Sequence, residues 1–135
     1  MSWEAGQQLE KQEFVVRRAD LVRYAGAAGD FNPIHWNDRI AHEVGLPGVV
    51  AHGMYTLALA GRALMSWVPD PAAVQTFGAR FTRPVVVPDD EDGARVEVSG
   101  SVTSLDEETG FATLELAVTH NGQKVLGMCR AVVRC

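Results

Sequence analysis

From Gly53 to Val68 the sequence reads G-M-Y-T-L-A-L-A-G-R-A-L-M-S-W-V, and its only charged side chain is Arg62. A helix that is apolar on nearly every face is a buried helix. Pro69 and Pro71 follow the stretch and end it. At 1.5 Å per residue such a helix is about 24 Å long, which is enough to form the axis of a small domain. We therefore expect the rest of the fold to be built around this helix.

The chain after Pro71 alternates between apolar and polar residues in the manner of β-strands. Four strand patterns follow one another, over residues 74–87, 95–103, 111–120 and 123–134. Asn121-Gly122 is a strong hairpin signal, so the strands are expected to be antiparallel. An alternating sheet needs an apolar partner on its inner face, and the helix supplies one. The predicted fold class is therefore α+β, an antiparallel sheet wrapped around one long buried helix.

The chain before the helix is expected to hold one strand and two shorter helices. In order, the pattern predicts an irregular segment over residues 2–12, a strand over 13–18, a helix over 20–28 and a short helix over 38–44. Asp20 is the expected N-cap of the first helix, and Asn37 or Asp38 that of the second.

The composition indicates one globular domain over residues 1–135, with 47% hydrophobic and 21% charged residues. The net charge is −5 and there is no basic run, so nucleic acid is not an expected partner. No apolar run reaches membrane-spanning length, and no signal-peptide pattern is present, so we expect a cytoplasmic protein without a membrane span. Cys129 and Cys135 lack the spacing of a metal site, and Cys129 is expected to be a small core residue.

Residues that can carry chemistry gather in the stretch Y-A-G-A-A-G-D-F-N-P-I-H-W-N-D-R-I-A of residues 24–41. Asp30 and His35 lie five residues apart across a turn that contains Asn32 and Pro33. A carboxylate and an imidazole held on one rigid turn can form an acid/base pair near neutral pH. Taken singly, Asp30 could instead cap a helix, and His35 could be an ordinary packed or surface histidine. The spacing alone leaves both interpretations open.

The whole run resembles the signature of the MaoC-like, (R)-specific enoyl-thioester hydratase/dehydratase family. The matching residues are Tyr24, Gly29, Asp30, Asn32, Pro33, Ile34, His35, Asp38 and Ala41. The stretches A-H-G-M at residues 51–54 and R-F-T-R-P-V-V-V-P-D-D from residue 80 are similar as well. The likeness covers nearly the whole chain and is greatest to the HadB-type catalytic subunit of actinobacterial β-hydroxyacyl-ACP dehydratases.

The resemblance implies a hot-dog fold with a helical overhang insertion at about residues 20–48. It implies a lyase that reversibly dehydrates (R)-3-hydroxyacyl thioesters to trans-2-enoyl thioesters, on acyl carrier protein or coenzyme A, in fatty-acid elongation. It marks Asp30 and His35 as the catalytic pair, which holds a water or hydroxyl between the two side chains. We favour His35 for the C2 proton, although the sequence does not decide which residue meets which proton. Neither a metal nor another cofactor is implied.

The other parts of this reaction are assigned to neighbouring residues. The thioester oxygen needs hydrogen-bond donors, and the first N–H groups of a helix are free and lie at the positive end of its dipole. Gly53 lets a ligand approach closely, so its backbone N–H is the expected oxyanion donor; a tight entry into the helix is the alternative. Asn32 is expected to hold the loop in shape. Met54 and Tyr55 could line an acyl pocket or belong to the core, and His52 is left outside the catalytic set.

A single sheet of this kind leaves an edge strand open and an acyl pocket incomplete, which predicts a homodimer or a heterodimer with a homologous hot-dog subunit. Two other functions compete with the lyase. Hot-dog thioesterases commonly use an acid on the central helix, whereas residues 53–68 contain no Asp or Glu. A non-catalytic acyl-binding subunit would have lost Asp30 or His35, and both are present.

Overall fold

The computed structural model describes residues 2–135 of the chain. Five antiparallel strands form one sheet in the order β1-β3-β4-β5-β2, so that β1 and β2 are its edges. The strands are β1 (Gln8–Val16), β2 (Val74–Phe81), β3 (Ala94–Asp106), β4 (Phe111–His120) and β5 (Gln123–Arg134). The antiparallel sheet predicted from the alternating pattern is confirmed.

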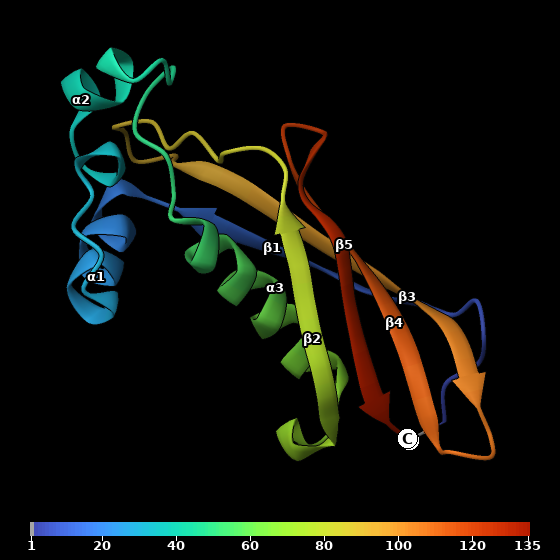
Figure 1. Cartoon of the computed structure of the whole chain (residues 1–135). Helices are drawn as coiled ribbons and strands as arrows, with labels where there is room; N and C mark the ends of the chain where they lie inside the picture. Colours follow the sequence, from blue (N-terminus) through green and yellow to red (C-terminus); the bar gives the residue numbers. More distant parts are fainter. Residues whose placement is uncertain (1) are drawn as a thin grey trace.

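The helix α3 (Gly53–Trp67) lies across one face of this sheet, as Figure 1 shows. Leu59, Ala60, Ala63 and Leu64 of α3 pack in one cluster with the inward-facing residues of the strands, among them Val98 of β3 and Leu114 of β4. A helix enclosed by an antiparallel sheet is the hot-dog arrangement, so the expected fold class is correct.

The burial of α3 is less complete than its sequence predicts. Met54 and Met65 on its outer face are 57% and 40% exposed, and the guanidinium of Arg62 lies 5.1 Å from the ring centroid of Phe14. The sheet covers only one side of the helix, and no other layer of the described chain covers these two methionines. α3 therefore carries more apolar side chains than the core of one chain buries.

Strand β1 begins earlier than expected, because residues 8–12 pair with β3 instead of being irregular. Gln8 lies opposite Ser101 and Leu9 opposite Gly100, and the register shifts between Leu9 and Gln12. β1 is an edge strand with many exposed residues, so its polar composition reflects a solvated face. The prediction of an irregular segment over residues 2–12 is wrong for this part.

The overhang consists of α1 (Arg18–Ala28), the 3₁₀ turn η1 (Pro33–His35) and α2 (Asp38–Glu43), and Figure 1 shows it beyond one end of the sheet. α1 starts before the position predicted, with Arg17 as N-cap. Asp20 lies in its first turn, where its carboxylate accepts a hydrogen bond from the Arg17 backbone N–H at 2.8 Å. The prediction that Asp20 is the N-cap is therefore wrong, whereas Asn37 caps α2 as expected.

The strand pattern of residues 74–87 divides into two parts. β2 ends at Phe81, and a second 3₁₀ turn, η2 (Pro71–Ala73), precedes it. Residues 85–87 instead pair with residues 49–51: the N–H of Ala51 donates to Val85 at 2.9 Å, and that of Val87 donates to Val49 at 2.9 Å. This pairing fixes the segment that leads from the overhang into α3.

Cys129 is buried in β5 as predicted, and burial raises the pKa of its thiol to about 11. Among residues 2–135, no helix combines the length and apolarity needed to cross a membrane.

Candidate active site

The loop between α1 and η1 is shaped by its own side chains. Gly29 ends α1 with a φ of 71°, a conformation that a residue with a Cβ rarely adopts. The carboxylate of Asp30 then accepts the N–H of Asn32 at 3.2 Å, and the side-chain oxygen of Asn32 accepts the N–H of Ile34 at 3.2 Å. These local bonds are the kind that Asp and Asn make in turns. Asn32 thus caps η1, which agrees with its predicted supporting position.

His35 lies at the end of η1 and is buried. Its Nδ1 is 2.7 Å from the backbone oxygen of Val50. A carbonyl oxygen can only accept a hydrogen bond, so in the neutral ring Nδ1 carries the proton and Nε2 keeps its lone pair. The partner of one ring nitrogen therefore assigns the other nitrogen as a base.

Asp30, His35 and His52 form a cluster in which a carboxylate oxygen and one ring nitrogen of each histidine lie within 4.8 Å of one another. Hydrogen bonds to an oxygen atom are about 2.8 Å long, so one water or hydroxyl fits between the acid and the base. Asp30 is exposed, whereas both histidines are buried. The cluster can therefore receive a polar group from solvent and hold it against a fixed imidazole.

In the sequence, His52 is marked only by its position beside Gly53. It is the residue before α3, it is 2% exposed, and its ring stacks on that of His35 with the centroids 3.8 Å apart. Its Nε2 lies 3.2 Å from the backbone oxygen of Asp30, and its Nδ1 has no hydrogen-bond partner among the described residues. Burial lowers the pKa of His52, so its imidazole is neutral near pH 7.

The residue types of this cluster also occur in metal sites. The two imidazole planes are inclined by only 21°, and the lone pair of an imidazole nitrogen lies in the plane of its ring. The lone pairs of stacked rings run side by side and do not converge on one ion. The arrangement as it stands therefore fits proton transfer better than metal binding.

Gly53 begins α3, as predicted, and its backbone N–H makes no hydrogen bond within the part of the chain that the structure describes. A Cβ at position 53 would lie 3.1 Å from the ring of Phe81, the last residue of β2. Glycine thus avoids a close contact with this ring, and the amide points from the positive end of a helix of 15 residues. The geometry suits a donor to a negatively charged oxygen.

Two hollows meet at Gly53 and Phe81. The larger has a volume of about 430 Å³ and a mostly apolar lining that includes His35 and Thr56. The smaller, of about 390 Å³, is lined in part by Asp30 and His52 together with Met54, Tyr24 and Ala28. Both volumes lie in the range of small-molecule sites, which runs from about 300 to 1,000 Å³. The acid and the base thus border adjoining spaces that share Gly53 and Phe81.

The structure brings Asp30, His35, Gly53 and Met54 to these two hollows but not Tyr55. The ring of Tyr55 packs edge-on against Tyr24 with the centroids 5.3 Å apart, and burial raises the pKa of its hydroxyl. Sequence reasoning missed Phe81, which borders both hollows, and Arg83, which borders the larger one. Both belong to the R-F-T-R-P stretch, and the resemblance of this stretch to the family is the signal that could have found them.

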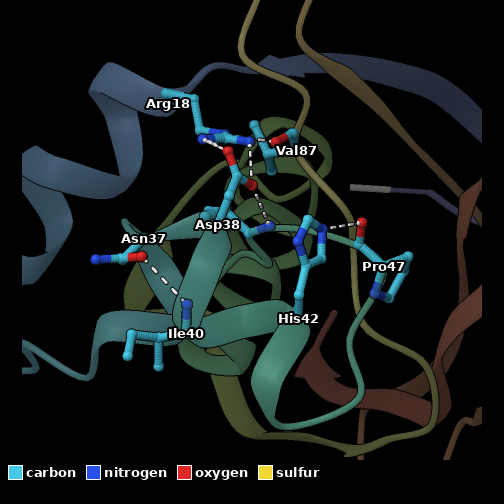
Figure 2. A network of polar contacts seen from close by, with 8 residues as sticks. Arg18, Asn37, Asp38, Ile40, His42, Pro47 and Val87 are labelled. Atoms are coloured by element: carbon cyan, nitrogen blue, oxygen red, sulfur yellow. Dashed lines mark hydrogen bonds and ion pairs between the residues drawn. The ribbon is translucent and has the colours of Figure 1, made fainter.

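A network of polar contacts, drawn in Figure 2, connects α1 and α2 of the overhang to Val87, which lies outside the overhang. Arg18 of α1 donates to the backbone oxygen of Val87 at 2.6 Å and to the carboxylate of Asp38 at 3.0 and 3.3 Å. Asp38 also accepts the N–H of Val49 at 3.2 Å. We call Arg18, Asp38 and these two backbone groups the brace. The hydrogen bonds from Arg18 lower the pKa of Asp38.

Comparisons with known proteins agree with this geometry. A family model described as "MaoC like domain" matches residues 2–121. The 3-hydroxyacyl-thioester dehydratase X of Mycobacterium tuberculosis is 43% identical over 70 residues, which are 52% of this chain and 24% of that protein.

Two solved structures have the same fold over 98% of this chain. One, titled MaoC-like dehydratase, has a TM-score of 0.94 and 38% identity, and the match covers 40% of its chain. The other, an (R)-hydratase from A. caviae involved in PHA biosynthesis, has a TM-score of 0.83 and 27% identity, and the match covers 97% of its chain. The chain thus spans less than half the length of the dehydratase X and of the first structure.

Proposed function

This chain belongs to the MaoC-like domain family, and from that premise we propose that it reversibly adds water to, and eliminates water from, acyl thioesters. The substrates proposed are (R)-3-hydroxyacyl and trans-2-enoyl thioesters on acyl carrier protein or coenzyme A. One observation carries the proposal: the hydrogen bond of 2.7 Å to Val50 leaves Nε2 of His35 basic, in a cluster with the carboxylate of Asp30.

In the dehydration direction, Nε2 of His35 takes the proton from C2, and the C2–H electron pair forms the new C2=C3 double bond. The C3–O bond breaks, and the departing oxygen takes the proton from the imidazolium to leave as water. Asp30 accepts a hydrogen bond from the hydroxyl and orients it. The thioester oxygen gains negative charge as the C2 proton leaves, and the N–H of Gly53 stabilises it.

The adjoining hollows fit the two ends of such a substrate. The larger hollow, bordered by His35, has a mostly apolar lining that suits an acyl chain. Asp30 and His52 border the smaller one, and these polar side chains suit the arriving water. Water and proton then reach the flat enoyl group from the same face, so the addition is syn and one fixed face gives a product of one hand. The (R) form is the hand that we propose from the family resemblance.

A thioesterase and a non-catalytic binding subunit are less well supported. α3 carries no carboxylate of its own, since its sequence is G-M-Y-T-L-A-L-A-G-R-A-L-M-S-W. A binding subunit would not need a carboxylate and a basic imidazole nitrogen in one cluster. The geometry therefore favours a hydro-lyase over both.

The finer assignment we propose is a HadB-type catalytic subunit that acts in fatty-acid elongation and works as a homodimer or beside a homologous subunit. The exposed apolar residues Met54 and Met65 of α3 and Phe81 and Met128 of the sheet support an association that would cover them. Light scattering at micromolar concentration should give a dimer mass. A stable and active monomer would contradict this assignment.

The experiment that tests the function follows the absorbance of crotonyl and longer trans-2-enoyl thioesters, on coenzyme A and on acyl carrier protein. We expect hydration of at least one of them, with the (R)-3-hydroxyacyl product found by chiral analysis. An (S) or racemic product would reject the proposed geometry. Release of free thiol without hydration would support the thioesterase instead.

A further inference from the structure

We propose that His52 is a positioning residue for this reaction. Its imidazole stacks on the ring of the base, His35, and binds the backbone carbonyl of the acid, Asp30. The inference rests on the proposed function and adds to it a residue that the sequence motif leaves out. His52 is placed by α3, whereas Asp30 and His35 belong to the overhang loop. It is therefore the point at which the helix controls the relative position of the other two.

The contact with His35 is a stack. The ring centroids are 3.8 Å apart and the planes are inclined by 21°. The hydrogen bond from Nδ1 to Val50 fixes one point of the His35 ring but still permits rotation about the N···O axis. A flat ring pressed against one face removes that rotation, so that Nε2 keeps one direction.

The contact with the acid is through the backbone. Nε2 of His52 lies 3.2 Å from the carbonyl oxygen of Asp30, so the ring donates its proton there. The residues flanking this carbonyl are exposed, and the carboxylate itself bonds only to the N–H of Asn32 among the described residues. The His52 bond thus ties an otherwise exposed turn to the buried base.

The remaining nitrogen of His52 distinguishes this role from simple packing. Nδ1 is buried without a partner among the described residues, and an unpaired buried polar atom is costly. Tyr24 meets the ring edge-on with the centroids 4.8 Å apart and fills the space on that side. A residue chosen for packing alone would be apolar, whereas a residue that must both stack and donate has to be an aromatic ring with an N–H or O–H group.

Two substitutions separate the two contacts. His52→Gln keeps an amide donor for the Asp30 carbonyl and loses the ring, whereas His52→Phe keeps the ring and loses the donor. We expect each to lower kcat by about tenfold to a hundredfold, with KM changed less than twofold, because small misplacements of reacting groups have effects of this size. His42→Phe is the matched control, since the ring of His42 also bonds a backbone carbonyl, that of Pro47 at 3.0 Å, but lies on α2.

A second measurement asks whether His52 acts through His35. Residues that act as a unit are not additive, so His35→Ala/His52→Gln should be no slower than His35→Ala alone. A loss of kcat that persists in the His35→Ala background would overturn the proposal, as would a wild-type kcat in both single variants. Circular dichroism and thermal melting identify any variant that fails to fold, and the other substitution then decides.

A readout without substrate keeps this test separate from the proposed function. In a protein labelled with ¹⁵N-histidine, NMR should show the Nδ1–H tautomer of His35 in all three proteins, because the Val50 carbonyl selects it. The ring signals of His35 should be broadened by rotation in His52→Gln and stay sharp in the wild type and in His52→Phe. If no thioester is hydrated but the ring signals behave in this way, the proposed function fails and the positioning role stands. Equally sharp His35 ring signals in His52→Gln would reject the positioning role itself.

Discussion

Two aspartates of the overhang, eight positions apart in the sequence, have opposite surroundings. Asp38 belongs to the brace, where an arginine and a backbone N–H share its carboxylate and lower its pKa. Asp30 belongs to the cluster with His35 and His52 that we propose to be catalytic, where its carboxylate accepts one bond, from Asn32, within the described chain. Polar groups with full sets of partners hold a structure, whereas groups with spare capacity can bind a substrate. We therefore expect the brace to serve stability and the cluster of Asp30 to serve the proposed chemistry.

The largest effect should come from the cluster. His35→Ala and Asp30→Asn are each expected to lower kcat by about 10² to 10⁴, the usual contribution of a general acid or base. The fold should persist, because neither side chain belongs to the apolar core. Turnover of an enoyl thioester and circular dichroism measure the two quantities. Full activity in either folded variant would reject the proposed catalytic role of the cluster.

Gly53→Val should lower kcat by about 10² to 10³, which is the loss measured when a well-studied hydrolase loses one oxyanion donor. The new side chain meets the ring of Phe81, which is 56% exposed and can move, so folding should change little. Gly26→Val is the control, because a Cβ at position 26 of α1 meets nothing within 4 Å. A fully active Gly53→Val enzyme would place the oxyanion site elsewhere.

Substitutions in the brace should change the free energy of unfolding more than they change kcat. Arg18→Met is expected to lower the free energy of unfolding by about 2 kcal/mol, since hydrogen bonds to charged groups contribute about 1.5 to 3 kcal/mol. The side chain of Asp38 is 46% exposed, so water replaces part of the hydrogen bonding that its carboxylate loses.

Arg39→Met is the control for the brace. It removes an exposed ion pair with Glu43 and should cost less than about 0.5 kcal/mol. Urea unfolding compares the two variants. Equal effects would mean that the brace is no more than a surface ion pair.

The smallest expected effect is a difference in pH dependence: His52 and Asp38 should lose their contributions to the free energy of unfolding at different pH values. The folded-state pKa is lowered for His52 and for Asp38, so the unfolded state binds more protons and stability falls as the pH falls. The loss begins below about 6.5 for His52 and below about 3.8 for Asp38, which are their unperturbed values. Asp30, His35 and Tyr24 also face His52, and all three are unchanged in His52→Phe.

Urea unfolding at pH 7.5, 5.5 and 3.5 measures this separation. His52→Phe should remove part of the first decrease in stability, and Asp38→Asn should remove part of the second. Identical pH profiles for the wild type and His52→Phe would show that the neutral state of His52 does not depend on its burial in the fold.

The sequence by itself determined the architecture and most of the chemical candidates. Alternation in the strands and an uncharged run in α3 are periodic signals of burial, and they led to the antiparallel sheet, the central helix and the hot-dog fold. The D-F-N-P-I-H stretch put Asp30 and His35 on one loop, because short-range turn chemistry is written in neighbouring residues. The predicted bounds of the two edge strands were less accurate. The start of β1 and the separation of β2 from residues 85–87 depend on which segment lies alongside.

Only the tertiary structure decided how the candidates work together. Three contacts join segments that are distant in sequence. The carbonyl of Val50 selects the tautomer of His35, His52 lies against both proposed catalytic residues, and Phe81 lies beside Gly53. No periodicity encodes them, because each depends on how the overhang, α3 and β2 meet in space. Arg18 and Asp38 show the same: two ordinary surface residues in sequence become a brace when folding brings α1 and α2 together.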